Sequence, residues 1–293
     1  MAGDEIIDEL LTGSVDLHVH VGPDPAYRRW GTRRFTLVDA GELAKKYGQP
    51  AVACKSHLQS TASLANLAQR ELSGVTLLGA IALNRTVGGL NPYAVRVAGQ
   101  LGARILWFPT LQSAHHLRMA DAEHRMQDAG EEGVYALDEK GDLKPEVGQI
   151  VDLIKEFDML LCTAHVSFPE ALAIVQAARA RGLDRLVVTH PFSSNAFTLE
   201  QAKQLADLGA AIEFTFIGMM PFGKQEKVDD AIEKMRAIGP QRCIITTDFG
   251  SYPTPPPPEG MRMFIGSLLM HGMEPEEVEW MCKRNPVRLA GIR

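Results

Sequence analysis

Two histidines, His18 and His20, stand two residues apart in the segment VDLHVHVGPD, which covers residues 15–24. On a β-strand, side chains two apart point to the same face, so the two imidazoles share one face while apolar residues fill the other. Gly22 and Pro23 follow at once and end the strand. Two neutral imidazoles placed in this way are typical of a clamp for a divalent metal ion.

Four more ionisable residues end apolar runs of the same kind: Lys55, His165, His190 and Asp248. Taken singly, a strand-end histidine is more often a hydrogen-bonded structural residue, and Asp248 could simply start a turn. Their joint placement favours a shared site, because imidazole and carboxylate are ligands that Zn²⁺ takes at about 2.0–2.2 Å. Such an ion lowers the pKa of a bound water toward about 7, which makes hydroxide available as a nucleophile.

These residues lie at the ends of short β-rich runs that alternate with helical stretches. The predicted strands cover residues 15–20, 51–55, 76–83, 104–108, 159–165, 185–190, 211–216 and 243–248. Amphipathic stretches lie between them; one ends at Gly182, a predicted C-cap, and another starts after Thr198, a predicted N-cap.

This alternation predicts an α/β fold, a closed (β/α)8 TIM barrel in a single domain, residues 1–293. In such a barrel the last side chains of the strands meet in one cup. An open doubly wound sheet is the alternative, but no G-x-G-x-x-G follows the first strand.

Two connections are unusual. Residues 109–158 form a predicted insertion after the fourth strand, with a turn at Lys140 and Gly141 and a helix over 146–157. His115 and His116 in this insertion either reach the site as a lid or lie at the surface. The segment SYPTPPPPEG, residues 251–260, is predicted as a rigid extended loop at the barrel rim, because its prolines suit neither a helix nor a ladder.

Composition restricts the class of protein. Of the 293 residues, 45% are hydrophobic, which is enough for one large core. A net charge of −6 without a dense basic cluster argues against a nucleic-acid partner and favours a small-molecule substrate. The start lacks the basic and apolar regions of a signal peptide and no run of about 18 apolar residues follows, so we expect a cytoplasmic protein without membrane contact. The cysteines show no C-x-x-C spacing and are expected to be reduced core thiols: Cys54, Cys162, Cys243 and Cys282.

The motifs together resemble the amidohydrolase superfamily of metal-dependent hydrolases, in one of its less characterised branches. The resemblance rests on DLHVH, CTAHVS, VVTHP, TTDFG and the closing NPVRLAG, and it covers nearly the whole chain. It implies that His18, His20 and Asp248 bind one metal ion, and that His165 and His190 bind a second ion or contact the substrate. It also implies that Asp248 takes the proton of the attacking water and passes it to the leaving group, which typically contributes 10²- to 10⁴-fold.

One departure from the superfamily concerns a lysine. Members with two metals often bridge them with a carboxylated lysine on the fourth strand, whereas here that strand ends ILWFPT. Lys55, on the second strand, is instead expected in the site as a bridging ligand, a substrate-binding cation or an ion-pair partner. We therefore expect Asp248, His190 and Lys55 to be catalytic. His57 shares the parity of Lys55, so it either faces the same mouth and contacts the substrate or is an ordinary loop residue.

Arginines suggest the substrate. Arg28, Arg29, Arg33 and Arg34 crowd the segment YRRWGTRR, and Arg85 follows the third predicted strand. Guanidinium groups suit carboxylates and phosphates, so an anionic substrate is expected, with Arg85 as the first candidate contact and Arg28 as another. The alternative for each is a solvated loop position.

The sequence thus predicts a metal-dependent hydrolase that activates water on one or two divalent ions. Its substrate would be small and anionic or cyclic, such as an amide, lactam or lactone, cleaved at a C–N or C–O bond. A metal-dependent decarboxylase of the same superfamily and a non-catalytic binding barrel are the alternatives. Zinc is the first expectation for the ion, with Mn, Fe, Ni or Co compatible with the same ligands. A homo-oligomer is left open.

Overall fold

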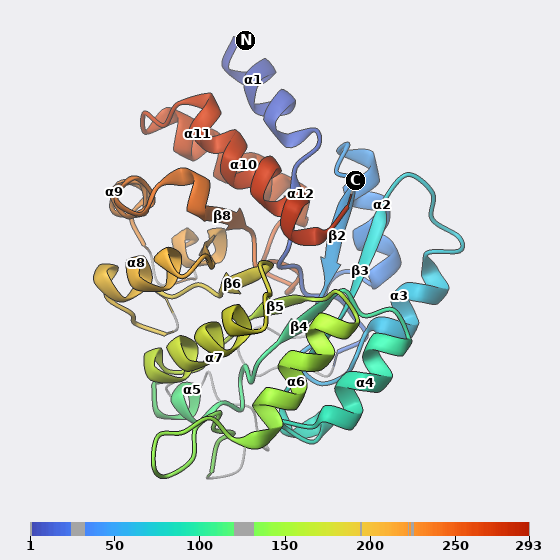
Figure 1. The fold of residues 1–293 in the computed structure, drawn as a ribbon. Coiled ribbons are helices and arrows are strands. Elements are labelled where there is room, and N and C mark those ends of the chain that lie inside the picture. Colours follow the sequence, from blue (N-terminus) through green and yellow to red (C-terminus); the bar gives the residue numbers. More distant parts are fainter. Residues whose placement is uncertain are drawn as a thin grey trace.

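The computed structural model describes residues 2–24, 33–119, 132–193, 195–221, 223 and 226–292. Eight parallel strands follow one another in chain order around one sheet (Figure 1). They are β1 (Val15–Asp16), β2 (Ala51–Cys54), β3 (Thr76–Ala82), β4 (Ile105–Trp107), β5 (Leu160–Cys162), β6 (Leu186–Val188), β7 (Ala211–Thr215) and β8 (Cys243–Thr246). Every strand residue except Thr76 is buried, as expected when helices cover a parallel sheet.

The sheet closes into a barrel just beyond the ladders of β1 and β8. Val19 and Phe249 form a parallel bridge, and the His20 N–H donates to the Phe249 carbonyl oxygen at 2.8 Å. Gly250 follows with a φ of +129°, and a Cβ atom at this position would collide with the carbonyl oxygen of His20. The predicted (β/α)8 barrel is therefore confirmed, and the alternative of an open sheet is wrong.

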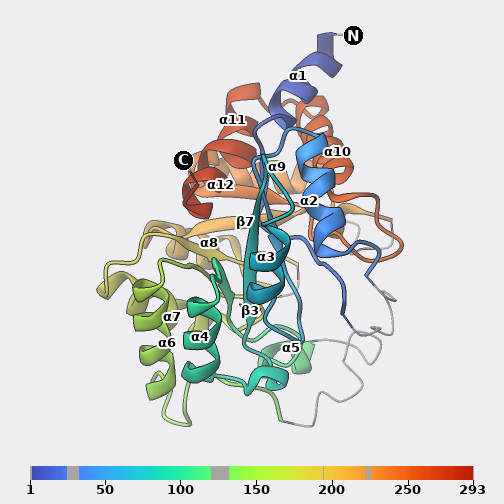
Figure 2. The ribbon, with the colours of Figure 1, turned by 90° about the vertical axis from the view of Figure 1, so that its right-hand side faces the viewer.

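The helices surround this barrel, and Figure 2 shows α2, α3 and α4 along the outside of β3. The N-terminal helix α1 packs against α10 and α11. The α-helices are α1 (Ala2–Leu11), α2 (Leu37–Lys46), α3 (Ala62–Ala68), α4 (Pro92–Gln100), α5 (Ala114–Met119), α6 (Pro145–Glu156), α7 (Phe168–Ala180), α8 (Leu199–Asp207), α9 (Val228–Ile238), α10 (Pro257–Met270), α11 (Pro275–Glu279) and α12 (Asn285–Ala290). Short helical turns are η1 (Arg85–Val87), η2 (Phe216–Met219), η3 (Pro240–Arg242) and η4 (Trp280–Arg284).

Local signals for helix ends act as predicted. Thr198 caps α8, and its side chain and that of Gln201 bond each other's backbone N–H in a capping box. Gly182, two residues beyond α7, has a φ of +79°, which glycine adopts at low cost.

The strand ladders are shorter than the sequence predicts. The predicted strands that end at His165, His190 and Asp248 leave their ladders at Cys162, Val188 and Thr246. The chain turns sharply there, with φ of +59° at Ala164, +27° at His190 and +57° at Asp248. Non-glycine residues in this region are strained, and such strain clusters at functional sites. The candidate site residues therefore stand on strand-end turns and not on regular strands.

The insertion after β4 is partly described. Leu137 and Leu143 form an antiparallel bridge around a turn in which Gly141 has a φ of +87°, as predicted. Helix α6 starts at Pro145, one residue before the predicted start. Residues 120–131 of the insertion lie outside the described residues.

The proline-rich loop is shorter than predicted, because α10 begins at Pro257. Pro257 and Pro258 occupy its first turn, where the backbone N–H groups have no partner within the helix and a fixed φ suits helix entry. The expectation that these prolines exclude a helix was therefore wrong for the last two.

Two further expectations concern the cysteines and the membrane. Cys54, Cys162, Cys243 and Cys282 are buried free thiols, as predicted. None of the described helices is both long enough and apolar enough to cross a bilayer.

Candidate metal centre

His18, His20 and Asp248 meet where the first and last strands close the barrel. The Nε2 atoms of His18 and His20 lie 3.1 Å and 2.9 Å from the same oxygen, Oδ1 of Asp248. The ligand atoms that the three residues offer all lie within 4.8 Å of one another. The strand pairing brings them together, since the Asp248 N–H donates to the His18 carbonyl oxygen at 2.9 Å. These three side chains could therefore bind one metal ion.

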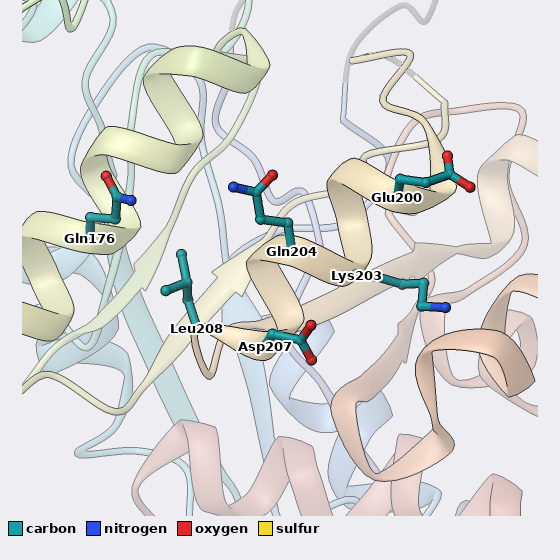
Figure 3. Close-up of a pocket in the computed structure, with 6 residues that line it drawn as sticks. All are labelled: Gln176, Glu200, Lys203, Gln204, Asp207 and Leu208. Carbon is teal, nitrogen blue, oxygen red and sulfur yellow. The ribbon is translucent and has the colours of Figure 1, made fainter.

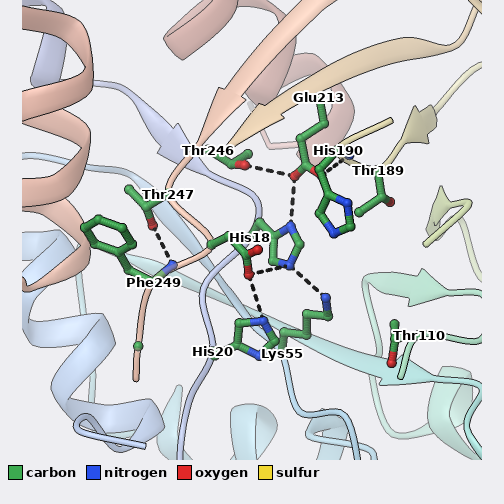
Figure 4. Close-up of polar contacts among 12 residues, drawn as sticks. His18, His20, Lys55, Thr110, Thr189, His190, Glu213, Thr246, Thr247 and Phe249 are labelled. Atoms are coloured by element: carbon green, nitrogen blue, oxygen red, sulfur yellow. Dashed lines mark hydrogen bonds and ion pairs between the residues drawn. The ribbon is translucent and has the colours of Figure 1, made fainter. Parts of the chain in front are cut away.

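Lys55 and Glu213 enclose His18 from two sides (Figure 4). The Lys55 Nζ lies 2.7 Å from His18 Nε2, and a parallel bridge with His20 sets the position of this lysine. Lys55 is only 1% exposed, and its Nζ lies 5.0 Å from the centre of the Trp107 ring on β4. The other ring nitrogen, His18 Nδ1, lies 3.0 Å from Glu213 Oε1. We call this set the carboxylate cluster: His18, His20, Lys55, Glu213 and Asp248.

Four further histidines adjoin the carboxylate cluster and form what we call the imidazole cluster: His57, His116, His165 and His190. Ring centroids lie 4.8 Å apart for His116 and His165, 4.9 Å for His165 and His190, and 6.4 Å for His57 and His165. The Nδ1 atoms of His165 and His116 lie 3.0 Å apart. All four residues are buried. The two clusters touch through the His20 and His57 rings, 4.6 Å apart, and the His18 and His190 rings, 5.7 Å apart.

In the carboxylate cluster, the electrostatics favour charge on His18 and on Asp248. Burial opposes protonation of His18, but the Asp248 and Glu213 carboxylates outweigh burial and raise its pKa to about 9. Burial also opposes ionisation of Asp248, yet His18 and His20 hold its pKa well below the usual value. Burial lowers the pKa of Lys55 to about 8. This cluster therefore holds opposite charges in close contact.

Electrostatics in the imidazole cluster favour neutrality. Burial lowers the pKa of His57 and of His165 well below the usual value for histidine. The pKa of His190 falls to about 4, again mainly through burial. These imidazoles are neutral at pH 7, the form in which histidine binds metals.

The sequence prediction thus names residues that the fold brings together. His18, His20, Lys55, His165, His190 and Asp248 all belong to the two clusters, and His57 joins them with its Nδ1 2.8 Å from Thr110 Oγ1. Of the two lid candidates, His116 reaches His165, whereas the His115 Nε2 lies 3.1 Å from the backbone oxygen of Asn195.

Arg85, the first arginine candidate, lies outside both clusters. Arg85 is exposed and lines a hollow of about 500 Å³ with Lys144 and Glu146, whose described lining includes no member of either cluster. Arg28 and Arg29 lie outside the described residues.

Among the described residues, Arg33 lies near the clusters. Its Nε donates to Asp24 Oδ2 at 3.1 Å and its Nη1 to Ser251 Oγ at 2.6 Å, and its side chain is 7% exposed. After burial, the charge of Arg33 is the next cause that lowers the pKa of His20. A buried guanidinium therefore stands at the edge of the carboxylate cluster.

Sequence reasoning missed Glu213. Its position was included in the strand predicted over 211–216, without a role. A usable signal was present, since Glu213 is the one charged residue in AIEFT, and a carboxylate in a buried strand needs a partner.

A surface hollow elsewhere lacks such chemistry. A hollow of about 450 Å³ between α7 and α8 is lined by six residues, drawn in Figure 3: Gln176, Glu200, Lys203, Gln204, Asp207 and Leu208. Its described lining contains neither a histidine nor a cysteine.

Solved structures with this fold include hydrolases. An amidohydrolase from Pseudomonas aeruginosa is 15% identical with a TM-score of 0.64, covering 98% of each chain. The probable dipeptidase PvdM from Pseudomonas aeruginosa is 11% identical with a TM-score of 0.70, covering 99% of this chain and 98% of that one. The phosphotriesterase homology protein from Escherichia coli, solved with phosphate in its active site, is 16% identical with a TM-score of 0.58, covering 95% and 99%.

These similarities confirm the predicted likeness to amidohydrolases at the level of the fold. Among curated protein sequences, none matches the chain. One family model does match, over residues 13–213, which includes β1 to β7 up to Glu213. The chain therefore belongs to the family of unknown function DUF6282.

Proposed function

We propose that this protein is a metal-dependent hydrolase of the amidohydrolase type, with a divalent cation bound by His18, His20 and Asp248. The observation that carries the proposal is the convergence of their three ligand atoms within 4.8 Å at the strand-end face of the barrel. Structures titled amidohydrolase and phosphotriesterase homology protein share this fold, which supports the reaction class by analogy.

The donor set fits a metal ion. Two imidazole nitrogens and a carboxylate oxygen suit Zn²⁺ best, and Mn, Fe, Ni or Co accept the same donors. Among the described residues, the buried ring nitrogens His20 Nδ1 and His190 Nδ1 lack a hydrogen-bond partner. Such atoms are uncommon in proteins, so they support a bound group in this space. When bound, the ion supplies a Lewis acid and makes hydroxide available near neutral pH.

Asp248 is the proposed general base and acid. The low pKa of Asp248 keeps it a carboxylate at pH 7, and two imidazoles hold its Oδ1 in place at 2.9 Å and 3.1 Å. It can accept the proton of the attacking water and return it to the leaving group.

Lys55 and His190 are the other proposed catalytic residues. Lys55 is buried beside His18, where its ammonium can stabilise negative charge that develops on the substrate. His190 offers a neutral ring next to His18 for orienting the substrate.

The substrate is proposed to be a small amide, lactam or lactone that carries a negative charge. With neutral histidines, the carboxylate cluster contains one ammonium and two carboxylates, and a divalent ion would reverse the sign of its net charge. The buried Arg33 guanidinium adds another positive charge nearby. Such a site favours an anion. Arg85 stays a candidate contact for a longer substrate.

The number of ions depends on the imidazole cluster. His165 and His190 supply neutral nitrogens for a second ion, and Lys55 could bridge the two ions if it were carboxylated. We propose that the first ion is the tighter one, because only the carboxylate cluster offers anionic oxygen among the described residues of the two clusters.

The test is elemental analysis of the purified protein beside His18→Ala and Asp248→Ala variants. We expect bound divalent metal in the wild type and little in the variants; equal metal in all three would remove the proposed nucleophile. Panels of anionic lactones and amides in ¹⁸O-labelled water then identify hydrolysis by label in the product. Release of bicarbonate without label in the organic product would instead identify a decarboxylase. If no compound is turned over and ligands bind equally with and without metal, the protein is a binding barrel.

A further inference from the structure

Glu213 is a buried carboxylate that contacts both clusters. It lies on β7, is 3% exposed, and accepts hydrogen bonds at both oxygens (Figure 4). Its Oε1 lies 3.0 Å from His18 Nδ1 and accepts from Thr246 Oγ1 at 2.9 Å. Its Oε2 accepts from the backbone N–H of His190 at 3.0 Å. One side chain therefore connects β1, β6 and β8 at the site.

The contact with Oε1 fixes which nitrogen of His18 keeps a proton when the ring is neutral. An ionised carboxylate can only accept, so Nδ1 of His18 donates to Glu213. The opposite nitrogen, Nε2, faces Asp248 Oδ1 at 3.1 Å, and a metal ion bound there would take the place of its proton. In metal sites, carboxylates that accept from the second ring nitrogen fix the tautomer and the ring orientation of the ligand.

The contact with Oε2 acts on a strained residue. The backbone of His190 has a φ of +27°, which a histidine rarely adopts. The hydrogen bond from its N–H to Glu213 supports this backbone turn, and the His190 ring lies 5.7 Å from the His18 ring.

We propose that Glu213 is a positioning residue that sets the tautomer of His18 for metal binding and holds His190 beside it. This inference rests on the proposed function, because it assigns Glu213 a part in metal affinity. The competing explanation is that Glu213 only fills a polar position in the core and stabilises the fold.

Glu170 provides a matched control for that explanation. It is also 3% exposed, and both of its carboxylate oxygens accept hydrogen bonds, from the backbone N–H groups of Ala136 and Ser167. Among the described residues, these partners lie in the insertion and at the N-cap of α7, and none of them is a clustered histidine. Replacing either glutamate by glutamine therefore disturbs a carboxylate with similar burial and hydrogen bonding, but only the change at Glu213 affects the site.

The experiment compares Glu213→Gln, Glu170→Gln and wild type. For each, Zn²⁺ affinity is measured by competition with a chromophoric chelator, and the melting temperature is measured on the chelator-treated protein. We expect Glu213→Gln to weaken Zn²⁺ binding about 10- to 100-fold, while Glu170→Gln leaves Zn²⁺ affinity unchanged. Equal Zn²⁺ affinity in Glu213→Gln and wild type would overturn the inference while leaving the metal proposal intact.

Two further measurements keep the inference testable if Glu213→Gln does not fold or if the wild type holds no Zn²⁺. Thr246→Val removes one donor to Oε1 and should weaken Zn²⁺ binding by a smaller factor than Glu213→Gln. Imidazole ¹⁵N spectra of metal-free wild type, recorded at rising pH until the His18 ring is neutral, should then show Nδ1 of His18 protonated. A proton on Nε2 of His18 there would overturn the inference independently of the metal.

Discussion

The carboxylate cluster and the imidazole cluster adjoin each other, but their buried histidines have different partners. In the first, His18 and His20 contact carboxylate oxygens of Asp248 and Glu213. In the second, the contacts join imidazole to imidazole or to the Thr110 hydroxyl. Buried charge is tolerated only when it is paired, whereas a neutral ring tolerates burial with far less support. The first cluster is thus suited to holding a cation, and the second to a weaker ion or to the substrate.

The largest expected effect is that of Asp248→Asn. This change keeps the size of the side chain but removes the charge that His18 and His20 share, so we expect loss of the tight metal ion and a 10²- to 10⁴-fold fall in turnover of any substrate found. Metal content and turnover are measured beside Asp229→Asn. Asp229 contacts His271 at 2.6 Å but is 70% exposed, and its loss should affect neither quantity.

A smaller effect is expected from His165→Gln in the imidazole cluster. The variant removes a neutral nitrogen from the second group of ligands, so a second, weak ion should be lost while the first is kept. Stepwise metal titration by calorimetry checks this. If the variant instead loses the tight ion, the two clusters act as one site and the distinction between them fails.

The pH dependence of stability should have opposite signs for His190 of the imidazole cluster and His18 of the carboxylate cluster. In metal-free protein, the pKa of His190 is lowered to about 4, so its contribution is present above about pH 6.5 and is lost as pH falls to 4. The pKa of His18 is raised to about 9, so its contribution is present below about pH 6.5 and is lost as pH rises through 9. Each amounts to at most about 3 kcal/mol.

Urea unfolding of metal-free protein between pH 5 and pH 9.5 measures both contributions. His190→Gln should flatten the acid side of the profile and His18→Gln the alkaline side. A variant that flattens the wrong side would contradict the charge states assigned to its cluster.

The smallest expected effect is optical. The Trp107 ring lies 5.8 Å from the His18 ring and 5.0 Å from Lys55 Nζ, so an ion in the carboxylate cluster should alter its fluorescence. Titration with Co²⁺, whose open d shell quenches indole emission, should give a saturable loss of signal that Trp107→Phe removes. Quenching that persists in Trp107→Phe would place the ion away from this cluster.

Much of the site could be predicted because strand ends in a parallel barrel share one rim. This rule predicts that His18, Lys55, His165, His190 and Asp248 lie close together, although each follows a different strand, and the fold does bring them together. The rule needs only the order of strands, and an error of a few residues in their ends does not alter it. The ladders in fact end two to four residues earlier at β1, β5, β6 and β8, without moving any of these residues from the rim.

Other features depend on packing that no local pattern encodes. Glu213 lies within a strand, and its hydrogen-bond partner His18 is 195 residues away in the sequence. No local sequence feature distinguishes Arg33 from Arg85. The bridge between Arg33 and Ser251 places Arg33 at the barrel rim. The prolines of 251–260 show the reverse case, because the same residue type serves both an extended loop and the first turn of α10.

The glycine at position 250 has a consequence for variation in this barrel. A Cβ atom at position 250 would collide with the His20 carbonyl oxygen. Any larger residue would therefore push apart the first and last segments of the barrel and move His20 away from Asp248. A variant with a larger residue at position 250 could keep His18, His20 and Asp248 and still be unable to bind an ion. The geometry of the proposed cation site therefore depends on a residue that has no side chain.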